Sequence, residues 1–158
     1  MLCDANIRVS WRARPRTFVA LMSLYESNHV RFVQLAGDPA RLCGTLWSRV
    51  AGDCVLQLAV LDHMRYTSCL SLTYLLPAAA GTPGVPSPER LPDLRLRAYH
   101  DARLLEVEMP QTARGAPYRT MRPAERELQQ RWARNMMLNK WLEYCAERGH
   151  RFLTAAPD

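Results

Sequence analysis

The sequence predicts an α+β fold: an N-terminal helix, an antiparallel sheet of about five strands in meander order, and a C-terminal helix packed on one face of the sheet. Helical spacing of apolar residues at both ends of the chain predicts the two helices. Alternation of apolar and polar residues through the middle predicts the strands, and the turn signals between them favour antiparallel neighbours. A sheet with one apolar face must be covered, and the two helices are the only elements that can cover it.

The most specific prediction is a hairpin over Leu94–Met109, which turns at Asp101-Ala102. In this register one face is wholly apolar, formed by the cross-strand pairs Leu94–Met109, Leu96–Val107 and Ala98–Leu105. The other face pairs opposite charges, Arg95 with Glu108 and Arg97 with Glu106. A shift by one residue would disrupt both faces together, so the pattern specifies the register as well as the strands.

The first helix is expected over Thr17–Ala36, where Thr17 suits the N-cap and Gly37-Asp38-Pro39 ends the helix. The closing helix is expected over Ala124–Arg148, with Pro123 at its first turn and Gly149 after its end. Its apolar stripe follows the 3.6-residue period and comprises Leu128, Trp132, Asn135, Leu138, Trp141 or Leu142, and Cys145.

Between the helices, Leu46–Val50 and Cys54–Val60 flank the turn signal Ala51-Gly52-Asp53. Trp47 is expected to face Leu58 and to add its large apolar area to the core. A third strand is expected over Tyr66–Leu76, and its apolar face comprises Ser68, Leu70, Leu72 and Tyr74.

One domain is the default for 158 residues. We expect it over residues 17–150, with a Pro-rich surface loop at 77–92, a basic disordered leader at 1–16 and a tail at 151–158. Hydrophobic residues make up 48% of the chain and charged residues 23%, and no apolar run is long enough for a membrane span. The five cysteines form an odd set without a C-x-x-C pair, which favours a reducing, cytoplasmic setting over a disulfide framework.

The net charge of +6 is concentrated in two segments, the leader and the stretch Arg114–Arg134. A basic excess of this kind can mark contact with nucleic acid. A solvated arginine-rich surface has the same composition, so nucleic-acid binding is an alternative function here and not the leading one.

Enzyme templates are absent: the chain lacks G-x-S-x-G, a Walker loop, G-x-G-x-x-G, H-E-x-x-H and C-x-x-C. The four histidines lie without metal-ligand spacing, so we expect no metal and no cofactor. Two turns each combine an acid, a histidine, an arginine and a tyrosine, and an up-and-down sheet would place both at one end. With a polar residue of the first helix they supply the candidate binding residues Asn28, Arg65, Tyr66, Tyr99, His100, Asp101 and Arg103.

Arginine at such a site suits an anion, and His100 beside Asp101 suits acid–base chemistry. Asp and His are also common turn formers that bond their own backbone. The leading expectation is a non-enzymatic binding or adaptor protein, with a small anionic ligand or a protein partner. Nucleic-acid binding through the leader and Arg114–Arg134 is the first alternative, and a small hydrolase using His100 with Asp101 or Glu106 is the second.

The stretch Arg97–Ala102, followed by Glu106-Val107, reads R-x-Y-H-D-A-x-x-x-E-V. Three further stretches accompany it: Leu21–Asn28, Arg65-Tyr66-Thr67, and Asn135 with Trp141–Cys145. In this order, over roughly residues 17–150, they resemble the motifs of the YqiB-like family of uncharacterised bacterial proteins (domain of unknown function 1249).

The resemblance implies a cytosolic single-domain protein without an assigned activity. Family genes often lie near those of an ADP-ribose-type Nudix hydrolase and a cyclic-AMP phosphodiesterase, which implies a link to nucleotide metabolism by association only. The chain departs from the family pattern where Gln129-Gln130-Arg131 replaces an acidic D-E-K triplet, and where the Pro77–Pro92 loop is longer than usual.

Overall fold

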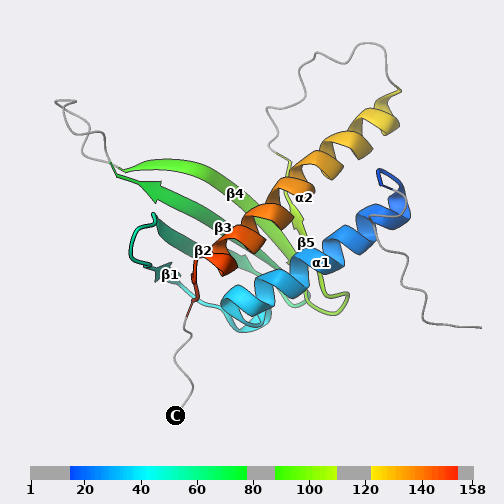
Figure 1. Ribbon diagram of the computed structural model, residues 1–158. Helices are drawn as coiled ribbons and strands as arrows, with labels where there is room; N and C mark the ends of the chain where they lie inside the picture. Colours follow the sequence, from blue (N-terminus) through cyan, green and yellow to red (C-terminus); the bar gives the residue numbers. More distant parts are fainter. Residues whose placement is uncertain (1–14, 78–87, 110–121, 153–158) are drawn as a thin grey trace, which may run out of the picture.

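A computed structural model of the chain describes residues 15–77, 88–109 and 122–152 (Figure 1). A helix, five strands and a second helix follow one another in the predicted order. They are α1 (Phe18–Ala36), β1 (Thr45–Ser48), β2 (Val55–His63), β3 (Thr67–Leu76), β4 (Glu89–Tyr99), β5 (Leu104–Val107) and α2 (Pro123–Glu147), with a short 3₁₀ turn η1 (Pro39–Arg41) after α1. Most of the predicted leader, most of the Pro-rich loop and the end of the predicted tail lie outside the described residues.

The predicted helix signals act as expected at both ends of α1. Thr17 is extended at the N-cap, and its Oγ1 accepts a hydrogen bond from the backbone N–H of Ala20 at 3.2 Å. Gly37 follows the last residue of the helix with φ of 83°, a left-handed conformation that ends the helix and favours glycine.

The five strands form one antiparallel sheet in the order β1-β2-β3-β4-β5, a meander as predicted (Figure 1). The backbone register of the β4–β5 hairpin is the predicted one, with Leu96 opposite Val107, Arg97 opposite Glu106 and Ala98 opposite Leu105. Both helices lie on the same face of the sheet and run side by side in the same direction (Figure 1).

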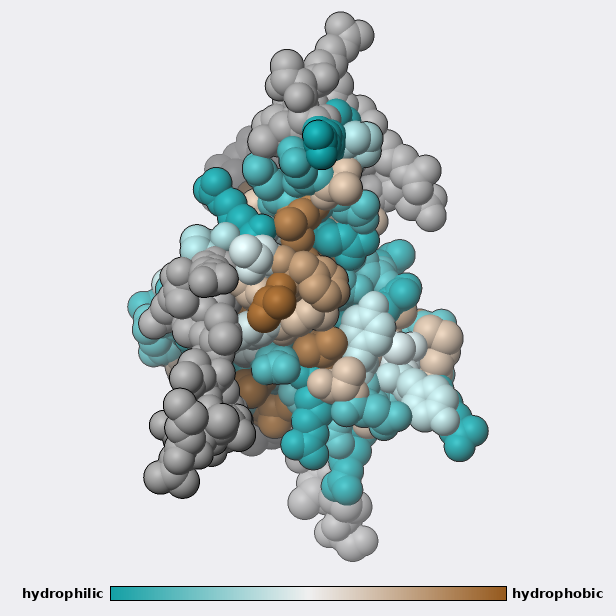
Figure 2. Space-filling view, turned by 90° about the vertical axis from the view of Figure 1, so that its right-hand side faces the viewer, coloured by the Kyte–Doolittle hydropathy of each residue, from teal (hydrophilic) through white to brown (hydrophobic). Residues whose placement is uncertain are grey.

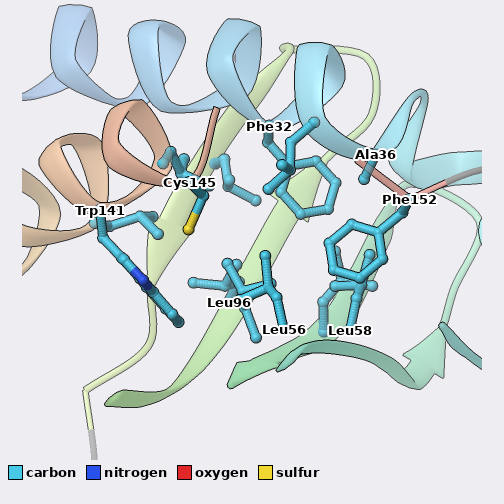
Figure 3. Close-up of a cluster of buried hydrophobic side chains, with 14 of the residues drawn as sticks. Phe32, Ala36, Leu56, Leu58, Leu96, Trp141, Cys145 and Phe152 are labelled. Carbon is cyan, nitrogen blue, oxygen red and sulfur yellow. The ribbon is translucent and has the colours of Figure 1, made fainter. Parts of the chain in front are cut away.

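The main core fills the space between this helical layer and the sheet (Figure 3). Phe32 of α1, Leu138 of α2 and five inward leucines of the three middle strands are all less than 2% exposed: Leu56, Leu58, Leu70, Leu72 and Leu96. Their burial stabilises the fold at about 25 cal/mol per Å² of apolar surface removed from water. Phe152, beyond α2 and two residues past the predicted end of the domain, also packs in this core (Figure 3).

A second apolar cluster joins the first halves of the two helices, where they project past the β5 edge of the sheet. Its buried members are Ala20, Leu21, Leu24, Tyr25 and Trp132. Figure 2 shows the end of the molecule where α1 begins, with hydrophobic side chains gathered at the centre of that face. Phe18 and Val19, in the first turn of α1, are 66% and 62% exposed.

Two details of the sheet differ from the sequence prediction. Trp47 pairs with Gln57 and is half exposed, because β1 is shifted by one residue and Leu46 faces Leu58 instead. β4 begins at Glu89, inside the stretch expected to be loop, and Pro92 lies at an irregularity of the β3–β4 register, where a strand tolerates proline.

No helix within the described ranges is long and apolar enough to cross a membrane.

Candidate functional site

The structure brings the two predicted turns together at one end of the sheet. The backbone N–H of His100, in the β4–β5 turn, donates a hydrogen bond to the carbonyl of Tyr66, in the β2–β3 turn, at 2.9 Å. The guanidinium of Arg65 lies 5.1 Å from the centre of the Tyr66 ring, a cation–π distance, and both side chains are exposed.

A buried serine joins histidines from the two turns. Ser68 Oγ forms hydrogen bonds with His63 Nδ1 at 2.9 Å and with His100 Nε2 at 2.8 Å, and the ring centres are 5.4 Å apart. Because a hydroxyl carries one proton, Ser68 donates to one ring and accepts from the other. The outer nitrogens, His63 Nε2 and His100 Nδ1, form no hydrogen bond with any described residue.

Charged and titratable groups lie close to this histidine pair. Burial lowers the pKa of His29, on α1; Asp38 opposes that effect, and the charges of Arg103 and His100 add to it. Arg103 is exposed at φ of 53° and forms no ion pair within the part of the chain that the structure describes. Asp101 is exposed in the same turn. In the described ranges no three His, Cys, Asp or Glu side chains are placed to hold a metal ion.

Asn28 does not point into this group, because it is fully buried between the helices and β5. Its Nδ2 donates to the carbonyl of Leu105 at 3.3 Å, and the Oδ1 of Asn135 on α2 accepts from the N–H of Val107 at 3.0 Å. These are the groups of β5 that point away from β4. The two asparagines therefore satisfy the open edge of the sheet, which would otherwise expose unpaired backbone groups.

Tyr99 points to the opposite face of the sheet, where its hydroxyl donates to Glu106 Oε1 at 2.6 Å. Burial, followed by the hydrogen bond and charge of Glu106, raises the pKa of Tyr99 to about 12. Arg131 of α2 reaches the other oxygen of Glu106 at 3.4 Å. Glu106 is thus held by a tyrosine and an arginine, and no hydrogen bond joins His100 to a carboxylate within the described residues.

The sequence did not reveal a third polar group, a buried serine–histidine–aspartate chain. His150, just after α2, forms 3.0 Å hydrogen bonds through Nδ1 with Ser48 Oγ and through Nε2 with Asp53 Oδ2. Ser48 Oγ also accepts from the backbone N–H of Arg151 at 3.0 Å. The histidine and serine are less than 6% exposed, so these bonds join the segment after α2 to β1 and the β1–β2 turn.

Two cavities lie away from the turns, at the end of β5. One cavity of about 320 Å³ has Arg95 and Arg134 in its wall, and an adjoining one of about 300 Å³ has Arg97, Glu106 and Arg131. Their residues come from β4, β5 and α2. Only the β4 and β5 residues are close in sequence, so no short sequence motif predicts these cavities.

Comparison with known proteins identifies a family without an assigned activity. The family model described as "Protein of unknown function (DUF1249)" matches residues 31–151, which is more than half of the chain. Neither the curated proteins nor the solved structures contain a match. The chain therefore belongs to the DUF1249 family, as the motif resemblance implied.

Proposed function

We propose that this protein is a non-enzymatic binding protein for a small anionic ligand. Its site is the group at the paired turns, formed by His29, His63, Arg65, His100 and Arg103 and here termed the tip site. The observation that carries the proposal is the convergence of three histidines and two arginines from three separate segments. Nitrogen-bearing side chains grouped in this way suit phosphate or carboxylate oxygens.

The hydrogen bonding within the tip site favours binding over catalysis. A general base needs a partner that orients its ring, most often a carboxylate, and a route to the substrate proton. Here Ser68, which is fully buried, orients both His63 and His100. Glu106, a candidate partner of His100 in a hydrolase, instead contacts Tyr99 and, on α2, Arg131.

Nucleic-acid binding ranks below the anion site. The leader is almost entirely outside the described residues, as are residues 114–121 of the Arg114–Arg134 stretch. Arg131, which the structure does describe, already pairs with Glu127 at 2.8 Å and with Glu106. If nucleic acid were the ligand, the affinity for a single-stranded oligonucleotide would fall steeply as salt increases.

The test is calorimetric titration of the full chain with inorganic phosphate, citrate and adenosine monophosphate, the last because the family resemblance implies nucleotide metabolism. We expect saturable binding of at least one anion. His100→Gln and Arg103→Asn should each weaken binding about tenfold. Asparagine is chosen at position 103 because it tolerates positive φ.

Arg90→Gln is the matched control, because Arg90 is exposed on β4 and far along the strand from the turns. It removes the same charge from the molecule and should leave the affinity unchanged. Binding of none of the three anions would overturn the proposal, and so would equal effects of Arg103→Asn and Arg90→Gln.

A further inference from the structure

The cavity of about 320 Å³ at the end of β5 is separate from the tip site and differs from it in chemistry. β4 and β5 form one wall and Arg134 of α2 the other. From its position and lining we infer that this cavity binds a small organic carboxylate, that is, one anionic group attached to an apolar body.

Some of the charged side chains in the cavity wall already have partners among the described residues, and others do not. Glu108 is held by Arg97, its diagonal neighbour across the hairpin, at 2.6 Å. Asp93 accepts a hydrogen bond from Thr73 Oγ1 at 2.6 Å. The expected Arg95–Glu108 pair is therefore not formed, and neither Arg95 nor Arg134 has an ion-pair partner among the described residues. The cavity wall thus has two guanidinium groups that no described carboxylate pairs with, beside two carboxylates that already have partners.

The remaining lining is apolar and comprises Leu94, Val107 and Met109. A bare phosphate would leave these side chains facing water, and a neutral hydrocarbon would leave both guanidinium groups without a partner. A carboxylate with an aromatic or branched body meets both requirements. The guanidinium binds the carboxylate in a forked geometry, and the body covers the apolar wall.

The adjoining cavity of about 300 Å³ shares Val107, Glu108 and Met109 and extends the space along the strand end. Its two arginines, Arg97 and Arg131, are already paired with Glu108 and Glu106. It extends the space beside the ligand without adding a further unpaired arginine among the described residues.

Benzoate is the probe for the test, with benzyl alcohol as the uncharged analogue and inorganic phosphate as the anion without a body. We expect benzoate to shift the methyl resonance of Met109 in the full chain, in a saturable way, and the other two compounds to leave it unchanged. Arg95→Gln and Arg134→Gln should each weaken benzoate binding about tenfold, while Arg95→Lys should retain part of the affinity.

Arg90→Gln, on the same strand but outside the cavity, should bind benzoate as the wild type does. Arg103→Asn should do so too, so failure of the tip site and failure of this cavity can be told apart. No saturable shift at Met109 would overturn the inference. Equal binding of benzoate and benzyl alcohol, or an effect of Arg90→Gln as large as that of Arg95→Gln, would also overturn it.

Discussion

At the scale of single residues, Asp53 shows how one carboxylate organises a junction between distant parts of the chain. Its Oδ1 accepts from the N–H of Cys54 at 2.8 Å, and its Oδ2 bonds His150 and lies 3.5 Å from the guanidinium of Arg148. Burial acts to raise the pKa of Asp53, but these three partners outweigh burial and lower it. The ionised form is therefore favoured in the folded protein.

Asp53→Asn should destabilise the protein by about 1 kcal/mol at neutral pH, because the variant loses the charge that His150 and Arg148 contact. A lowered folded-state pKa contributes stability above the unfolded-state pKa of about 3.9, and this is lost as pH falls through the folded value. Urea unfolding should show the full difference from pH 5 to 7 and a smaller one near pH 3.

Glu26→Gln is the control for this prediction, because Glu26 is an exposed carboxylate on α1. It should change the free energy of unfolding little at any of these pH values. A difference between wild type and Asp53→Asn that persists unchanged at pH 3 would mean that Asp53 acts through shape and not through its charge.

At the scale of elements, β5 is a four-residue edge strand whose outer side is closed by side chains and not by another strand. Asn135 is the central group: its Oδ1 accepts from Val107, and its Nδ2 donates to the carbonyl of Arg131 at 2.8 Å. Asn135 lies in the stripe of α2 that otherwise forms core, so the helix presents an amide where the sheet needs an acceptor.

Asn135→Leu should destabilise the protein by about 1–3 kcal/mol, because it leaves the buried N–H of Val107 without a partner. Amide hydrogen exchange at Val107 should accelerate, since that N–H becomes the least protected of the β5 edge. Met137→Leu, an exposed change on the same helix, should alter neither quantity. Unchanged protection at Val107 would show that the edge is closed by something other than Asn135.

The elements also show how far a sequence can predict this fold. The β4–β5 register was predictable because the same register gives both an apolar face and a face of opposite charges. The ion pairs were not, because diagonal neighbours are also within reach in a sheet: Arg97 pairs with Glu108, and Glu106 turns to Tyr99 and Arg131. Arg131 is 25 residues from Glu106 in sequence, so no local sequence pattern predicts this contact.

Partners far away in the sequence explain the other differences. The alternation around β1 allows either Trp47 or Ser48 to face inward, and burial of the larger apolar residue was the natural expectation. Ser48 is buried instead because it bonds His150, 102 residues later. For the candidate site, the meander correctly predicts that the two turns meet, whereas Asn28 is held by Leu105 and Asn135 in a way that helical periodicity alone does not indicate.

At the scale of the whole molecule, the last described residues close the fold onto its first helix. The backbone N–H of Phe152 donates to the carbonyl of Leu35, the last but one residue of α1, at 2.9 Å. The Phe152 ring is 5% exposed and lies among the inward leucines of the sheet (Figure 3). The end of α1 and the residues after α2 are thus parts of one core, and we expect this core to be complete only when the residues after α2 have docked.

Phe152→Ala tests this closure, and Phe18→Ala is its matched control, since the same atoms are removed from a side chain that is 66% exposed. The buried change should lower the free energy of unfolding by about 3–5 kcal/mol, because it removes apolar contacts and leaves a cavity. The exposed change should stay within about 0.5 kcal/mol. If the core is one cooperative unit, Phe152→Ala should also accelerate amide exchange in the middle strands and in α1 together. Faster exchange confined to residues 148–152 would instead mean that the chain end docks onto a core that is already complete without it.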